Sequence, residues 1–190
     1  ALTKLAANLD QKFSNLCEVI LRSKGKIITL GVGKSGHIAQ KISSTLSSTG
    51  SPSYFIHATE ALHGDIGVIS KNDSVLIFSH SGESKEIIDL IPSLKNIGCK
   101  IFSFTGPTES TIAKSTDINI STEVDKEACP LDLAPTSSTT AALALGDALA
   151  IALLESRKFS PQDFAKSHPG GKLGKKLTLK VEDIMSKGKD

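Results

Sequence analysis

The spacing of hydrophobic positions changes several times along the chain. From Leu2 to Ile20 these positions recur at helical intervals, which predicts one N-terminal amphipathic helix that is over by Gly25. After it, short β-branched runs alternate with helical stretches. The runs predict strands at residues 27–32, 53–56, 74–78, 100–104 and 117–120. Helices are predicted at residues 38–48, 84–97, 110–114 and 138–156.

An alternation of strands and helices is typical of repeated βαβ units. It predicts an α/β fold, a three-layer α/β/α doubly wound sandwich with a mainly parallel five-stranded sheet in flavodoxin-like order. In that order the first and third strands are neighbours, and a ligand binds where their carboxyl ends meet. The apolar run at 141–154 is interrupted by Asp147 and is too short to cross a bilayer, so we expect a buried core helix.

Composition narrows the classes of function. The chain has 190 residues, 39% hydrophobic and 22% charged, with a net charge of +2, which predicts one core of ordinary size. Because the lysines are dispersed and there is one tyrosine and no tryptophan, we expect no nucleic-acid partner and no membrane partner. Cys17, Cys99 and Cys129 lack CxxC spacing, which argues against a disulfide or zinc framework and favours a reducing cytoplasm.

A serine-rich turn follows the third predicted strand. Ser79, Ser81 and Ser84 lie between the strand and the next helix, and Gly82 allows the backbone to approach a ligand. At a helix N-terminus, unpaired N–H groups and the helix dipole favour an anion, and the hydroxyls add donors. The turn is therefore predicted to bind phosphate. Simple capping of the helix would explain one serine but not three.

A second loop follows the first predicted strand, at residues 31–37. Its glycines complete neither GxGxxG nor a P-loop, so alone it is a weak signal. The predicted strand order brings it opposite the serine turn, and the convergence of the two loops is the stronger evidence. Lys34 in this loop suits a phosphate or a developing oxyanion, the alternative being a solvated surface lysine.

Carboxylates and histidines supply candidates for proton transfer. Glu86 lies in the first turn of the helix after the serine turn, where it could equally compensate the helix dipole. Glu127 and His168 lie on loops that carry helix-breaking residues, and such loops often carry function. His57 and His63, with Glu60, could bind metal but lack a specific ligand spacing. With the phosphate site, this set suits aldose-ketose isomerisation through an enediolate.

Several ordered motifs together resemble the arabinose 5-phosphate isomerases, which are sugar isomerase (SIS) domain proteins. The motifs are Gly-Lys-Ser-Gly-His at 33–37, His-Gly-Asp at 63–65, Ser-His-Ser-Gly-Glu-Ser at 79–84, Lys-Glu-Ala-Cys-Pro-Leu at 126–131, Ala-Pro-Thr-Ser-Ser-Thr-Thr at 134–140 and Ser-His-Pro-Gly-Gly at 167–171. The resemblance covers nearly the whole chain. It implies interconversion of D-ribulose 5-phosphate and D-arabinose 5-phosphate, which supplies Kdo for lipopolysaccharide or capsule. The alternatives are a non-catalytic SIS module that senses a phosphosugar and an isomerase of another phosphosugar.

The resemblance also assigns roles to residues. The catalytic positions match Lys34, Glu86, Glu127 and His168. Substrate-binding positions match Gly33, Ser35, Gly50, Ser51, His63, Ser79, Ser81, Gly82, Ser84, Ser137 and Ser138. No cofactor is implied as required, although His57 matches a ligand of a Zn²⁺ ion that is often inhibitory. Which glutamate acts as the base stays open.

Family members usually form tetramers whose active sites take residues from neighbouring subunits, so the resemblance implies a homotetramer in which His168 acts across an interface. They also usually continue into a pair of CBS domains. We therefore expect a SIS domain at residues 1–178, followed at 179–190 by a linker and the start of a CBS domain, and a cytoplasmic location.

Overall fold

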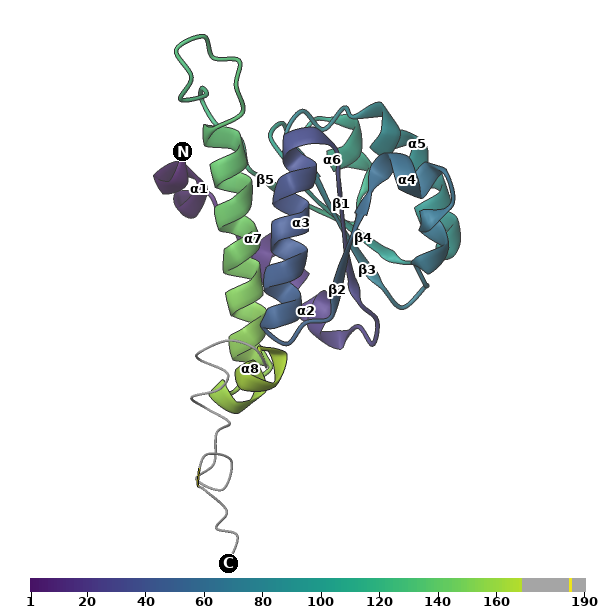
Figure 1. Cartoon of the computed structure of the whole chain (residues 1–190). Helices are drawn as coiled ribbons and strands as arrows, with labels where there is room; N and C mark the ends of the chain where they lie inside the picture. The colour runs from purple at the N-terminus through teal and green to yellow at the C-terminus, as the bar shows by residue number, and fades with distance from the viewer. Residues whose placement is uncertain (169–184, 186–190) are drawn as a thin grey trace, which may run out of the picture.

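The computed structural model describes residues 1–168 and 185. Along the chain its elements are α1 (Leu2–Ala7), α2 (Gln11–Arg22), β1 (Ile27–Gly31), α3 (Gly33–Ser48), β2 (Ser53–His57), α4 (Ala58–Leu62), the 3₁₀ helix η1 (Asp65–Val68), β3 (Ser74–Ser79), α5 (Lys85–Ile97), β4 (Lys100–Thr105), α6 (Thr111–Ser115), β5 (Ile118–Ser121), α7 (Ser137–Ser156) and α8 (Pro161–Ser167). Figure 1 shows their arrangement.

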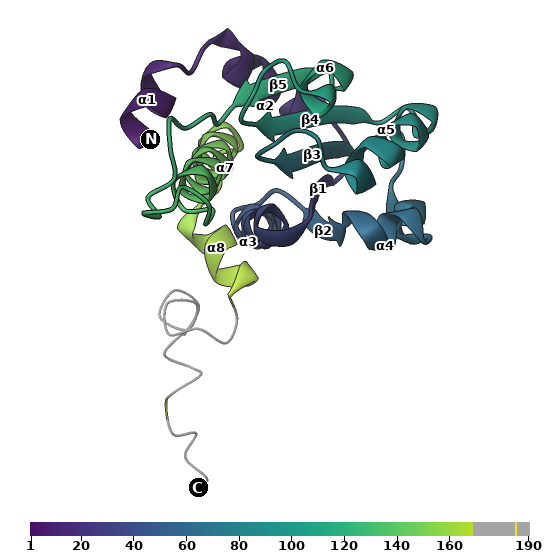
Figure 2. The ribbon, with the colours of Figure 1, turned by 90° about the horizontal axis from the view of Figure 1, so that it is seen from above.

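The sheet has the predicted topology. Its five strands run in the order β2-β1-β3-β4-β5, and each neighbouring pair is parallel. The strand residues alternate between two cores, as Leu76 and Ile77 illustrate: Leu76 faces the helices α2, α3 and α7, and Ile77 faces α4, α5 and α6. Viewed from above, the helices form a layer on each face of the sheet (Figure 2). The predicted three-layer α/β/α sandwich is confirmed.

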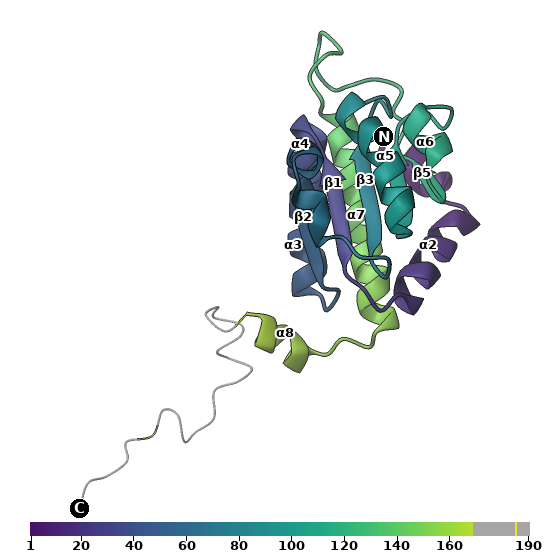
Figure 3. The ribbon, with the colours of Figure 1, turned by 90° about the vertical axis from the view of Figure 1, so that its right-hand side faces the viewer.

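The N-terminal region differs from the prediction of one helix. Two helices, α1 and α2, replace it, and the helical conformation is interrupted between them. At the start of α2 the Asp10 side chain accepts a hydrogen bond of 2.8 Å from the Lys12 N–H. A short polar side chain that caps a new helix competes with continuation of the old one, and this explains the break. Figure 3 shows α2 against the edge of the sheet that carries β5. The short elements α4, η1 and α8 were not predicted from the hydrophobic pattern.

The long helix α7 is a core helix. All 20 of its residues together are long and apolar enough to cross a membrane, but Ala141, Leu145 and Leu149 are buried against the sheet, as expected for the run at 141–154. A Cβ at Gly146 would lie 2.5 Å from Ile42 on α3, so glycine permits the close approach of the two helices.

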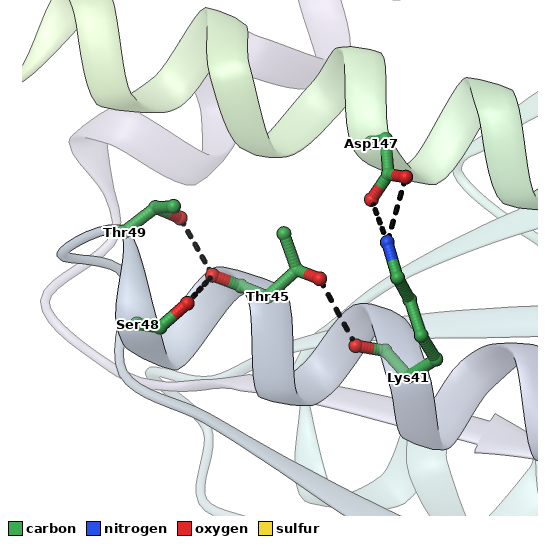
Figure 4. Close-up of polar contacts among 5 residues, drawn as sticks. All are labelled: Lys41, Thr45, Ser48, Thr49 and Asp147. Atoms are coloured by element: carbon green, nitrogen blue, oxygen red, sulfur yellow. Dashed lines mark hydrogen bonds and ion pairs between the residues drawn. The ribbon is translucent and has the colours of Figure 1, made fainter. Parts of the chain in front are cut away.

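A polar contact joins α3 and α7 beside that close approach. Asp147 of α7 accepts hydrogen bonds from the Lys41 ammonium of α3, at 2.6 Å for its Oδ2 atom (Figure 4). On α3 itself, the Thr45 hydroxyl donates to the Lys41 carbonyl at 3.2 Å. The charge within the apolar run therefore faces a partner rather than the core. The first turn of α7 forms one side of the cavity described next.

Candidate active site

A cavity of about 280 Å³ lies where the carboxyl ends of β1 and β3 meet the first turn of α7. Residues from both predicted loops line it, Lys34 and Ser35 after β1 and Ser81 and Ser84 after β3. Its apolar wall is formed by Val32, Ile38, Phe78, Phe104, Pro135 and Ala142. The convergence of the two loops, expected from the strand order, is therefore present.

The serine turn forms one wall of the cavity. The Ser79 and Ser84 hydroxyls lie 3.0 Å apart in a hydrogen bond, and the Ser81 hydroxyl accepts from the Glu83 N–H at 3.2 Å. Gly82 has a φ of +67°, a left-handed conformation that favours glycine. The sharp turn that results brings three serines into the lining of the cavity.

Three helices begin at the cavity without a cap from their own N-cap side chain. They are α3, whose N-cap is Val32, α5, whose N-cap is Ser84, and α7, whose N-cap is Thr136. Ser84 bonds to Ser79 instead of to the first N–H groups of α5, so the capping alternative does not describe it. Helix starts of this kind favour an anion through their N–H groups and the helix dipole.

The cavity wall carries a positive charge. Among the described residues that line it, Lys34 supplies that charge, and none is an Asp or a Glu. The His80 ring lies against Gly106, where an added Cβ would be 3.0 Å from a ring carbon. The wall therefore combines hydroxyl donors with positive charge, which suits a phosphate.

Glu127 lies directly behind this wall and caps α7. Its carboxylate accepts hydrogen bonds from the Thr136 N–H at 2.8 Å and the Ser138 N–H at 3.1 Å, and also from the hydroxyls of both residues. In turn, the Glu127 N–H donates to Asp132 at 2.6 Å. Because Ser138 lines the cavity, one hydroxyl separates the Glu127 carboxylate from it.

These hydrogen bonds control the protonation of Glu127. Burial favours the neutral acid and would raise the pKa, but the bonds from Ser138 and Thr136 stabilise the carboxylate and outweigh it, lowering the pKa from 4.5 to about 2. Glu127 is therefore fully ionised at neutral pH. The Ser138 hydroxyl, at a position that the resemblance assigns to substrate binding, donates to Glu127.

Glu86 is placed differently from Glu127. It lies in the first turn of α5, is exposed, and does not line the cavity. Within residues 1–168 its side chain forms no hydrogen bond or ion pair, and this position suits a carboxylate that compensates the dipole of α5. Ser137, at the start of α7, also lies outside the lining.

Three of the predicted site residues lie at the opposite end of the domain. His168 ends α8, where its ring stacks on Phe164 with centroids 3.9 Å apart. Gly50 and Ser51 follow α3, and the Ser51 hydroxyl accepts from the Arg157 guanidinium at 3.1 Å. The 20 residues of α7 span about 30 Å, so one chain does not bring this group to the cavity (Figure 1).

The histidines next to α4 do not form a metal site by themselves. His57 caps α4, since its Nδ1 atom accepts from the Thr59 N–H at 3.3 Å, and His63 is exposed at the other end of the helix. In the part of the chain that the structure describes, no three His, Cys, Asp or Glu side chains are grouped so as to hold a metal ion. The described residues alone thus offer Zn²⁺ no complete ligand set at His57.

Two hydroxyl-bearing lining residues were not predicted. Thr122 directly follows β5 and Thr139 lies in the first turn of α7. The position of Thr122 after a strand could have indicated it, because carboxyl ends of parallel strands meet at one edge.

The domain boundary predicted at 178 and the CBS start at 179–190 lie outside the described residues, apart from Met185.

Comparison with known proteins adds independent evidence. Arabinose 5-phosphate isomerase KdsD of Pseudomonas aeruginosa is 53% identical over 188 residues, which cover 99% of this chain and 58% of the relative. The protein of the same name from Francisella tularensis is 52% identical over 192 residues, covering 100% of this chain and 59% of the relative. The chain therefore spans less than two thirds of the length of these relatives.

A solved structure gives the same answer for the fold. A protein from E. coli CFT073, in complex with arabinose 5-phosphate, superposes with a TM-score of 0.86 at 44% sequence identity, covering 88% of this chain and 89% of that one. Residues 20–152 match the SIS domain family, which agrees with the resemblance found in the motifs. The sequence match, the superposition and the position of the hydroxyl-lined cavity at the carboxyl ends of β1 and β3 agree with one another. The chain belongs to the SIS domain family.

Proposed function

We propose that this chain is the isomerase domain of an enzyme that interconverts D-ribulose 5-phosphate and D-arabinose 5-phosphate. The observation that carries the proposal is the cationic, hydroxyl-lined cavity at the start of α3 and α5, with an ionised carboxylate one hydroxyl behind it. The names of the KdsD relatives supply the substrate. We further propose that the enzyme is cytoplasmic and supplies Kdo.

The phosphate of the substrate binds at the serine turn. The hydroxyls of Ser79, Ser81 and Ser84 and the start of α5 provide its donors, and Lys34 and Ser35 reach it or the adjacent carbonyl from α3. An enediolate carries negative charge that its substrate lacks, so a lysine ammonium at this position stabilises the transition state more than the ground state.

Glu127 is the better of the two candidate bases. A base must be ionised and must reach the proton, and Glu127 is ionised and adjoins the cavity through Ser138. Its four donors weaken it as a base in this arrangement. A substrate hydroxyl that takes the Ser138 bond would free one oxygen and raise the pKa of the carboxylate toward the range that proton transfer needs. Glu86 then supports the start of α5.

The reaction can be followed directly. Incubation of the chain with ribulose 5-phosphate in deuterated water should give arabinose 5-phosphate that carries deuterium at C2, because the proton returned to the enediolate exchanges with solvent. Formation of product is measured by coupled assay and the label by mass spectrometry. A hexulose phosphate serves as the comparison substrate, and faster turnover of it would assign another phosphosugar. Absence of both product and exchange would contradict an isomerase and favour a sensor.

We also propose that the active site is completed by a second copy of the chain, within a tetramer. Lys34 and Glu127 lie at one end of the domain, whereas His168, Gly50 and Ser51 lie at the other. If all belong to one site, residues from two chains must meet. His168 would then assist ring opening or relay a proton in its neighbour's cavity.

Mixed oligomers test this sharing. His168→Ala and Glu127→Gln chains, each inactive alone, should regain about a quarter of wild-type activity when co-expressed with two different tags and purified through both. The reason is that a random mixture pairs an intact Glu127 with an intact His168 in some of its sites. Activity that stays at the level of the single variants would place both residues in one chain.

A further inference from the structure

A second polar hollow lies at the amino-terminal edge of the sheet, opposite the active site. Its volume is about 370 Å³. The end of α2, the turn before β3 and the first residue of β4 form its walls. Four basic side chains line it: Arg22, Lys24, Lys71 and Lys100.

A buried hydroxyl of this hollow has no partner. Ser74, the first residue of β3, is 1% exposed, and its Oγ atom forms no hydrogen bond within the described residues. The Ser74 N–H is already used, since it donates to the Lys26 carbonyl at 2.9 Å. A buried hydroxyl without a partner is costly, so a group that accepts a hydrogen bond from Ser74 within the hollow stabilises the fold.

The negative groups around the hollow are already engaged. Both oxygens of Asp73 accept backbone hydrogen bonds, from the Lys26 N–H at 2.7 Å and the Ser70 N–H at 2.7 Å. The carbonyls that end α2 accept from the Ser23 N–H. Asp73 therefore has little capacity left for a further cation.

The positive groups are only partly paired. Arg22 bonds to Glu18 at 3.2 Å and Lys100 to Asp117 at 3.3 Å, both on the exposed surface. Lys24 and Lys71 form no ion pair among residues 1–168. Two unpaired ammonium groups, a guanidinium and a buried hydroxyl donor together suit an oxyanion, and phosphate accepts from all three kinds of donor.

From the unpartnered Ser74 and the unpaired lysines we infer a second anion site, which takes phosphate or the phosphate group of a small metabolite. The site is separate from the serine turn, because β3 runs between them, from Ser74 at one end to Ser79 at the other. Binding there stabilises the folded chain without occupying the active site. The inference does not depend on the proposed reaction.

Thermal unfolding with inorganic phosphate as the probe tests the site. Sodium phosphate at 10 mM, compared with sodium chloride at equal ionic strength, should raise Tm by about 3 °C for a site of millimolar affinity. The serine turn also binds phosphate, so the test uses a Lys34→Gln/Ser81→Ala background. In this background the increment, which is the rise in Tm caused by phosphate, should persist. Adding Lys24→Gln/Lys71→Gln to the same background should remove it.

Matched variants separate the site from general charge effects. Lys12→Gln/Lys95→Gln removes two positive charges elsewhere on α2 and α5 and should keep the increment. Ser74→Ala should reduce it by at least half, because the buried donor is lost. Glycerol phosphate in place of inorganic phosphate distinguishes the two sources, and a larger increment with the ester assigns a metabolite. Loss of the increment in the Lys34→Gln/Ser81→Ala background, or its retention in Lys24→Gln/Lys71→Gln, overturns the inference.

Discussion

Replacement of Glu127 by Gln should lower kcat by at least about 10³-fold, because the amide cannot accept the substrate proton. Glu86→Gln is the matched control, the same change in the first turn of α5, and should lower kcat by no more than about tenfold. Steady-state kinetics with ribulose 5-phosphate give kcat and KM. Deuterium exchange separates proton abstraction from later steps.

The two carboxylates give opposite patterns if their roles are reversed. Loss of exchange in Glu86→Gln together with its retention in Glu127→Gln would make Glu86 the base and Glu127 a residue that only positions α7. Ser138→Ala provides a second readout. It removes one hydrogen bond to the Glu127 carboxylate and should raise the pKa of that group. The acid limb of the pH profile of kcat/KM should therefore move to higher pH, and turnover should not be abolished.

The Glu127→Gln variant should also lose stability in a pH-dependent way. The pKa of Glu127 falls from 4.5 in the unfolded chain to about 2 in the folded one, so its ionised form stabilises the fold. That contribution is complete above pH 4.5 and is lost as the pH falls toward 2. With allowance for solvent screening it amounts to about 1–2 kcal/mol. Urea unfolding at pH 7 and pH 3 should show a larger gap between wild type and Glu127→Gln at pH 7.

Local sequence patterns predicted the features that depend on nearby residues. The β-branched run at 74–78 is buried on both faces, and the serines after it follow from chain order alone. Strand order then placed the loop with Lys34 beside them, since the βαβ rule constrains which strands are neighbours. Together, the serine turn and the strand order predict the position of the cavity from the sequence alone.

Other features depend on contacts that spacing does not encode. Glu127 bonds to Thr136 and Ser138, nine and eleven residues away, through a loop with no regular hydrophobic period. The resemblance assigned Ser138 to substrate binding, but its hydrogen bond to Glu127 was not predicted. The place of His168 was equally hidden, because it depends on the length and direction of α7.

Gly82→Ala should destabilise the chain by about 3 kcal/mol and lower Tm by about 9 °C. An added Cβ would lie 2.0 Å from the Ser110 hydroxyl oxygen and 2.4 Å from its Cβ atom, in a backbone conformation with φ of +67° that disfavours side chains. The turn must open to relieve the clash, which moves Ser81 and Ser84 apart. KM for the phosphosugar should therefore rise by at least about tenfold, as steady-state kinetics can measure.

Gly98→Ala isolates the steric part of this effect. Gly98 also has a positive φ, of +80°, but no atom lies within 4 Å of its added Cβ, so we expect only the conformational cost of about 1 kcal/mol and an unchanged KM.

Adding Ser110→Gly to Gly82→Ala removes both clashing atoms. Ser110→Gly also removes the cap of α6. Even so, the loss of unfolding free energy in the double variant should be smaller than the sum of the losses in the two single variants, by about 1–2 kcal/mol. Strict additivity would mean that the serine turn does not depend on contact with Ser110.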